Sequence, residues 1–121
     1  MAAAAERIYL KALELAPGNP ETLKRLGIVE QTEMRFEESI THFKQALSRD
    51  AQYLEVNFFL GVSYFGQNDF ANAIQSFQQE LATAKPHRRC RYYLGLAFQS
   101  AGRTDVKAII HREYPFLKCL I

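Results

Sequence analysis

The chain has 121 residues, of which 48% are hydrophobic and 23% are charged, and its formal net charge is +2. This length suits a single domain with enough apolar residues to form a core, and no run of about 18 apolar residues, as a membrane span requires, is present. Because the charge is nearly balanced, we expect no general attraction to nucleic acid.

Apolar residues recur every three or four positions along most of the chain, which is typical of amphipathic helices, and no segment alternates with the period of two of a half-buried strand. Asn19 is an expected N-cap and Pro20 a first helical residue, and Asp69 and Thr104 follow glycine-containing turns as further caps. We therefore predict an all-α chain with helices over residues 3–16, 20–32, 36–49, 53–66, 70–84, 87–101 and 105–113.

A Leu-Gly pair returns at a fixed interval, as Leu26-Gly27, Leu60-Gly61 and Leu94-Gly95. The interval is 34 residues (60 − 26 and 94 − 60), and the same interval separates Phe43 from Phe77 (77 − 43). A period of this length is one supersecondary unit that buries its apolar face only by stacking on a neighbour. A glycine inside a helix costs roughly 1 kcal/mol relative to alanine, so three in register indicate a close approach of paired antiparallel helices.

These residues resemble the tetratricopeptide repeat, whose pattern is Trp-x-x-Leu-Gly-x-x-Tyr, then Ala-x-x-x-Phe, then Pro. The middle repeat reads Asn57-x-x-Leu60-Gly61-x-x-Tyr64 and Ala73-x-x-x-Phe77. The tryptophan is missing from all three repeats, and the resemblance covers residue 3 to about residue 110.

The resemblance implies a right-handed α-solenoid of antiparallel helix pairs that binds proteins rather than catalyses reactions. The resemblance also implies that residues 1–121 form one domain with an opening half-repeat, two repeats, a degenerate repeat with an irregular C-terminal helix, and a tail. These parts cover residues 3–17, 20–51, 54–85, 88–113 and 114–121.

The first helix of each stacked pair lines the concave surface of such a solenoid. Counting from the Leu-Gly pairs places an apolar and aromatic groove with a polar border on that surface, which suits a peptide or an amphipathic helix. The expected peptide-binding residues are Lys24, Ile28, Gln31, Phe58, Val62, Phe65, Arg89, Tyr92, Leu96 and Gln99. Packing between repeats is the alternative for the aromatic residues, because neither Phe58-Phe59 nor Tyr92-Tyr93 can point both rings the same way.

Both ends of the chain depart from the pattern. The chain opens in the second helix of a repeat, so that Ala5, Tyr9, Ala12 and Leu13 lack the helix that would cover them. The tail over 114–121 is either an improvised cap or a sign that the chain is a piece of a longer array, and the start within a repeat favours the piece. The alternative function is therefore self-assembly through the terminal helices, with Tyr9 and Leu13 as contact residues.

Positive charge gathers at residues 85–91, at the start of a helix where the dipole favours anions. This cluster is either a docking point for an acidic side chain, a phosphate or a carboxylate, or a solvated helix start whose arginines pair with Glu55 or Glu80; we favour the solvated start. Some tetratricopeptide domains clamp a C-terminal carboxylate with Lys, Asn and Arg, but only Lys24 matches outright. The other clamp places hold Ile28, Phe59, Arg89 and Tyr93.

The chain offers little support for catalysis or metal binding. His87 and Cys90 have no second Cys/His pair to complete a zinc site, and no phosphate-binding loop or catalytic triad pattern is present. We therefore expect a non-enzyme without cofactor or metal. The two cysteines, Cys90 and Cys119, lie far apart, and the first residues lack a secretory pattern, so we expect free thiols and a cytoplasmic location.

Overall fold

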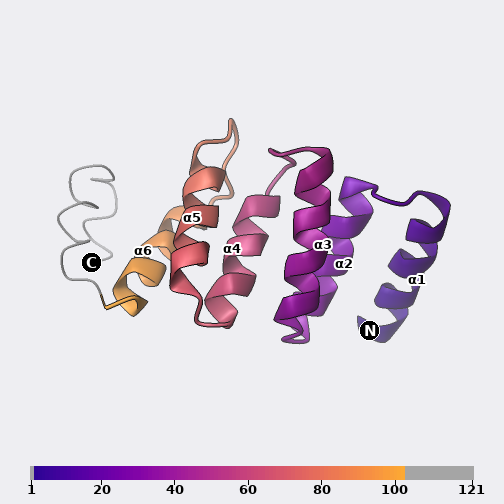
Figure 1. Ribbon diagram of the computed structural model, residues 1–121, viewed down its shortest axis with the longest axis horizontal. Helices are drawn as coiled ribbons and strands as arrows, with labels where there is room; N and C mark the ends of the chain where they lie inside the picture. Colours follow the sequence, from indigo (N-terminus) through magenta and orange to yellow (C-terminus); the bar gives the residue numbers. More distant parts are fainter. Residues whose placement is uncertain (1, 103–121) are drawn as a thin grey trace.

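The computed structural model describes residues 2–102 and contains six α-helices that follow one another along the long axis of the molecule (Figure 1). No strand occurs in this range, and the all-α solenoid expected from the sequence is confirmed. The helices are α1 (Ala2–Leu15), α2 (Pro20–Thr32), α3 (Phe36–Arg49), α4 (Val56–Gly66), α5 (Phe70–Leu81) and α6 (Cys90–Ser100). The helix predicted over 105–113, the cap Thr104, Cys119 and the tail lie outside the described residues.

The predicted caps account for the starts of α2 and α5. The Asn19 side chain accepts a hydrogen bond from the Thr22 N–H at 3.1 Å, and Pro20 occupies the first turn, where no N–H is needed. The Asp69 side chain accepts from the Asn72 N–H at 3.3 Å in the same way. The predicted bounds of α2 and α3 agree with the structure.

The α3–α4 and α5–α6 connections shorten three predicted helices. α4 begins at Val56 instead of 53, because Glu55 adopts a left-handed conformation with φ 67° that interrupts the helix. α5 ends at Leu81 instead of 84, and Pro86 disfavours helical geometry in the residue before it. α6 begins at Cys90 instead of 87, and in the segment before it the His87 N–H is bonded to the Glu80 carboxylate at 2.8 Å.

Each helix packs against the next one along the chain, and in addition α2 contacts α4 and α4 contacts α6. No such contacts join α1, α3 and α5, so α2, α4 and α6 form the inner layer of the described part of the solenoid. The core consists of two clusters, and α4 contributes to both. One contains Leu23, Ile40, Phe43, Ala46, Val56 and Leu60, and the other contains Phe58, Ala73, Phe77, Cys90, Leu94, Ala97 and Phe98.

The repeated glycines allow the helix pairs to approach closely. A Cβ atom on Gly27 would collide with the Phe43 ring, and one on Gly61 would lie 2.5 Å from Cε1 of Phe77. Both phenylalanines are fully buried. The close approach expected from the periodic Leu-Gly pairs is therefore confirmed for α2–α3 and α4–α5, with an aromatic ring filling the space that the missing side chain leaves.

Arg35 ties α1 to the next repeat. This residue lies in the turn between α2 and α3, and its guanidinium donates to both carboxylate oxygens of Glu6 in α1 at 2.9 and 3.0 Å. It also donates to Glu38 at the start of α3. Because a bidentate arginine–carboxylate pair fixes direction as well as distance, Arg35 contributes to the orientation of α1 on the repeat, together with the packing of α1 on α2.

Candidate functional site

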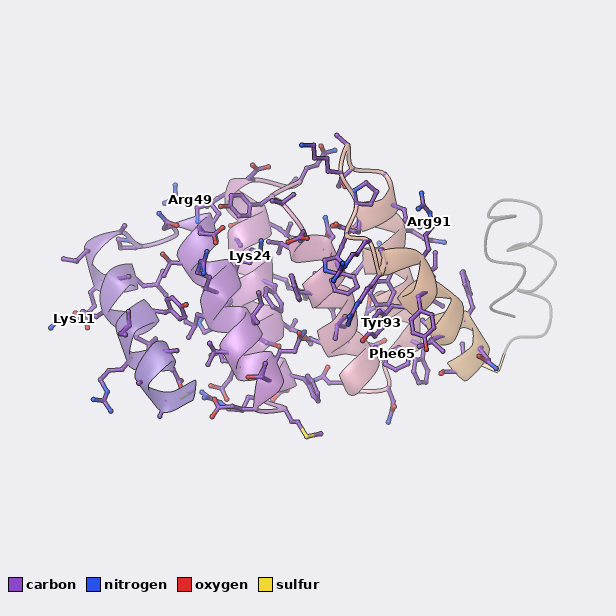
Figure 2. All side chains as sticks on the ribbon, turned by 180° about the vertical axis from the view of Figure 1, so that it is seen from behind. Lys11, Lys24, Arg49, Phe65, Arg91 and Tyr93 are labelled. Atoms are coloured by element: carbon purple, nitrogen blue, oxygen red, sulfur yellow. The ribbon has the colours of Figure 1, made fainter. Side chains whose placement is uncertain are left out.

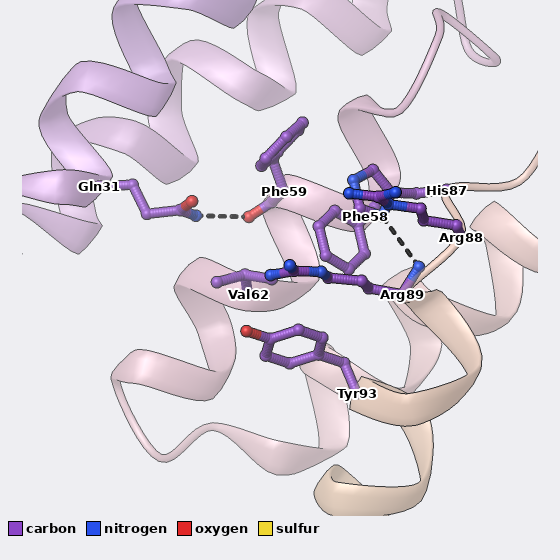
Figure 3. A pocket seen from close by; sticks show the side chains of 8 residues that line it. All are labelled: Gln31, Phe58, Phe59, Val62, His87, Arg88, Arg89 and Tyr93. Carbon is purple, nitrogen blue, oxygen red and sulfur yellow. Dashed lines mark hydrogen bonds between the residues drawn. The ribbon is translucent and has the colours of Figure 1, made fainter.

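A pocket of about 230 Å³ opens on the inner layer, between α2, α4 and the start of α6 (Figure 3). Four of the ten predicted peptide-binding residues meet in it, namely Gln31, Phe58, Val62 and Arg89. The other four lining residues are not among the binding residues predicted from the sequence: Phe59, His87, Arg88 and Tyr93.

Aromatic rings form the floor of the pocket. Phe58 is only 4% exposed, and its ring stacks on the His87 imidazole with centroids 3.8 Å apart and planes 2° apart. Phe59 and Tyr93 meet the Phe58 ring edge-on at 5.1 and 5.4 Å. Phe58 therefore belongs to the core and lines the pocket at the same time, which unites the two alternatives that the sequence left open for it.

Gln31 holds one wall of the pocket in place. Its side-chain Nε2 donates to the Phe59 carbonyl at 2.8 Å and to the Ser63 hydroxyl at 2.7 Å, and the Ser63 hydroxyl is 2.6 Å from that of Ser39. This chain of hydrogen bonds joins α2, α3 and α4 through the half-buried Gln31 and two buried serines. The amide nitrogen of Gln31 is thus committed to the fold, and its oxygen remains the group that can face a ligand.

A buried carboxylate fixes the segment that carries the histidine. Glu80 is 1% exposed, and its Oε2 accepts the His87 N–H at 2.8 Å. Burial raises the pKa of Glu80 and lowers the pKa of His87. The Nδ1 atom of His87 accepts the Arg89 N–H at 3.1 Å, which places the proton of the neutral ring on Nε2, 3.9 Å from Glu55.

Two arginines stand at the rim of the pocket. Arg88 and Arg89 are exposed, and neither guanidinium forms an ion pair with any residue between 2 and 102. Glu55, a partner expected for the arginines of residues 85–91, instead lies 3.4 Å from Lys24, and Glu80 binds the backbone of His87. For Arg88 and Arg89 the expected pairing with Glu55 or Glu80 is therefore wrong, whereas both side chains are exposed, as at a solvated helix start.

The remaining predicted binding residues do not line the pocket. Phe65 and Tyr93 lie close together at the α6 end of the molecule (Figure 2), with centroids 6.4 Å apart. Tyr92 is 51% exposed and meets Tyr93 edge-on at 5.8 Å. Ile28 and Leu96 are half-buried, Gln99 is exposed, and Lys24 is paired with Glu55.

The outer face of α1 is a second candidate surface. Ile8 is 65% and Leu15 is 86% exposed, and both line a shallow hollow with Arg7, Lys11 and Ala12. Tyr9 and Leu13, the expected contact residues, are half-buried because they turn towards the neighbouring helix. Leu13 packs against the core cluster that contains Leu23, and Tyr9 contributes, after Glu21, to raising the pKa of the Arg25 guanidinium.

The described residues offer few groups that could bind a metal ion or act as a nucleophile. Within residues 2–102 no three His, Cys, Asp or Glu side chains gather as a metal site would require. Cys90 is buried, its thiol donates to the Phe77 carbonyl at 3.2 Å, and burial raises its pKa to about 12, so that little thiolate forms at neutral pH. None of the helices between these limits has the length and apolar character to cross a bilayer.

Comparisons with known proteins agree with this architecture. A family model described as tetratricopeptide repeat matches residues 25–88 and 64–106. The crystal structure of MamA is similar, with a TM-score of 0.76 and 29% sequence identity, over 83% of this chain and 58% of the MamA chain. The chain thus spans less than two thirds of the length of that relative. A comparison with curated protein sequences gives no significant match.

Proposed function

We propose, from the premise that this chain belongs to the tetratricopeptide-repeat family, that its inner layer binds a peptide or an amphipathic helix of a partner protein. Members of this family are in general protein–protein interaction modules. The proposal places the binding site in the pocket between α2, α4 and the start of α6.

The observation that carries this proposal is the composition of the pocket. Its floor is aromatic, its walls come from three consecutive repeats, and its rim is polar and charged. Recognition surfaces combine an apolar anchor site with a polar rim in the same way. A volume of about 230 Å³ is below the usual range for small-molecule sites, so one or two partner side chains fit it better than a cofactor.

The proposed role is binding without catalysis, in the cytoplasm and without nucleic acid. The buried free thiol of Cys90 supports a reducing compartment, and its raised pKa makes it a poor nucleophile. The nearly balanced net charge of +2 supports a protein partner in preference to a nucleic acid.

The test begins with short peptides selected on the immobilised chain from a random displayed library. Val62→Glu puts a carboxylate into the pocket from a half-buried position, and we expect it to weaken the selected peptides by about tenfold or more in fluorescence anisotropy. Phe58 is unsuitable for this purpose, because a charge at a buried core position would unfold the protein.

Leu54→Glu is the matched control, because Leu54 is exposed and lies outside the pocket. Circular dichroism and the thermal midpoint confirm that both variants are folded. If the selected peptides bind Val62→Glu as tightly as the wild type, their binding site lies outside the pocket, and the proposed function is wrong.

A second candidate function is self-assembly through α1. The exposed side chains of Ile8 and Leu15 favour it, since they form an apolar face with Ala12. The equivalent of Ala12 one period later (12 + 34) is Ala46, which is completely buried between helices. A helix from a second copy could cover the α1 face in the same way.

A further inference from the structure

We infer that the segment bound in the pocket carries an acidic side chain, Asp or Glu, whose carboxylate binds Arg88 and Arg89. The inference rests on the proposed function and adds the chemistry of the partner to it. No carboxylate lines the pocket, whereas both arginines do.

The charge balance around the pocket supports an anionic ligand. Two carboxylates lie close to its lining residues, and both are already engaged. Glu55 is paired with Lys24 at 3.4 Å and faces His87 at 3.9 Å, and Glu80 is buried beneath the His87 backbone. Within residues 2–102 this leaves the guanidinium groups of Arg88 and Arg89 without a counter-charge at the rim.

The direction of the side chains also suits a carboxylate. In Figure 3 both arginines extend from the segment before α6 across the mouth of the pocket, and the Tyr93 hydroxyl points towards the same space. The forked guanidinium of arginine matches the two oxygens of a carboxylate, and a tyrosine hydroxyl can donate a further hydrogen bond. The first turn of α6 contains no acidic residue, so the positive end of the helix adds to the attraction.

An acidic side chain fits this environment better than the C-terminal carboxylate of a partner. The side chain brings its own apolar stem, which can lie on Val62 and on the rings of Phe58 and Phe59. A terminal carboxylate needs several polar donors around it, and Lys24, the residue that would be first among them, is committed to Glu55. Hydrophobic residues of the same partner segment would occupy the aromatic floor.

The experiment uses the peptides selected on the immobilised chain, each measured by fluorescence anisotropy. Arg88→Gln/Arg89→Gln should weaken a peptide with an acidic residue by about tenfold, because charge-assisted hydrogen bonds are lost. Lys85→Gln is the matched control: it removes the same kind of charge from the same stretch, but Lys85 does not line the pocket. The control should leave the affinity nearly unchanged at moderate salt.

A thermodynamic cycle makes the test specific. Replacing the acidic residue of the peptide by Gln or Asn should weaken binding to the wild type by about tenfold, but change binding to the double arginine variant little. An amidated C-terminus separates the two sources of carboxylate: amidation should leave binding intact, and a loss of binding on amidation would overturn the inference in favour of a chain end.

The outcomes distinguish the inference from the function on which it rests. If Val62→Glu abolishes peptide binding but the double arginine variant binds the same peptides at full strength, the pocket binds peptides, and the inference of an acidic side chain is wrong. If selection yields neutral or basic peptides at the pocket, the inference is likewise wrong. If no peptide is selected, or if Val62→Glu has no effect on those that are, both the inference and the proposed function are wrong.

Discussion

At the scale of single residues, Glu80 is the group whose ionisation matters most for the fold. Its carboxylate is almost completely buried, and only one of its two oxygens has a hydrogen-bond partner among the described residues. A buried charge without an adjacent cation is costly, which is the physical cause of its raised pKa. The hydrogen bond that Glu80 accepts from the His87 N–H partly offsets this cost, and it holds the segment that forms one side of the pocket.

Glu80→Gln should therefore be more stable than the wild type at neutral pH, because the amide keeps a hydrogen-bond acceptor and removes the buried charge. The folded protein binds the Glu80 proton more tightly than the unfolded chain, so the wild type regains this stability as the pH falls through the raised pKa towards 4.5, the ordinary value. Thermal midpoints of both proteins, measured from neutral pH to about that value, should converge. A wild type that is the more stable at neutral pH would contradict this explanation.

Two adjacent tyrosines show how far the binding residues can be predicted from sequence. Helical periodicity places Tyr92 and Tyr93 about 100° apart around α6, so it identifies the inner layer but not which ring enters the pocket. Which tyrosine enters the pocket depends on contacts with other helices. The Tyr93 ring meets the Phe58 ring edge-on, with centroids 5.4 Å apart, and lies tilted against the Phe77 ring, with centroids 6.1 Å apart. The sequence places Arg88 in the basic cluster of residues 85–91, but Arg88 precedes α6, and helical periodicity gives no direction to a side chain in a turn.

At the scale of helices, packing between neighbours is governed by the pairing of glycine with phenylalanine. Gly61 of α4 faces Phe77 of α5 so closely that an added methyl group overlaps the ring. The ring is itself enclosed by Phe58 and Tyr93, so it has little room to move. The packing of α4 on α5 therefore depends on the absence of a side chain at one position.

Gly61→Ala should destabilise the protein by about 1–2 kcal/mol, because overpacking outweighs the gain of roughly 1 kcal/mol in helix propensity. Urea unfolding followed by circular dichroism measures the change. Adding Phe77→Leu, which removes the ring that the new methyl group meets, should make Gly61→Ala much less costly than it is alone. Equal costs in the two backgrounds would show that this contact is not responsible.

Helix limits could be predicted where local chemistry decides them. Asn19 and Pro20 determine the start of α2, and both act within a single turn. The start of α4 depends instead on the left-handed conformation of Glu55, which is uncommon for a residue with a side chain. Since contacts between repeats hold Glu55, including the pair with Lys24, its local sequence carries no signal for that limit.

At the scale of the whole molecule, the two candidate surfaces lie on different parts of the solenoid. The pocket belongs to the inner layer, whereas the apolar face of α1 lies at the far end from α6, where Lys11 projects from the helix (Figure 2). The two proposed functions therefore have independent tests. The solenoid could be predicted from the 34-residue period (60 − 26), because stacking is the way such units bury their apolar faces, and the family from the motifs that recur with that period.

If α1 drives assembly, the mass measured by light scattering should rise with concentration for the wild type and stay at that of a monomer for Leu15→Glu. Leu15 is the better target than Leu13, since Leu13 packs against the core and a charge there would also disturb folding. Leu54→Glu, at an exposed position away from α1, should behave like the wild type. A wild type that is monomeric at every concentration would exclude assembly through this face.

The nearest-neighbour packing of the helices also has a consequence for synthesis on the ribosome. Among the described residues, the hydrogen bonds that reach furthest along the chain join positions 32 apart, such as Gln31 with Ser63 and Glu21 with Tyr53. Each helix can thus find its partners as soon as about one further repeat has left the exit tunnel. The nascent chain would acquire its structure in steps from α1 towards α6, and the pocket would be completed only when the segment around Arg88 and the start of α6 have emerged.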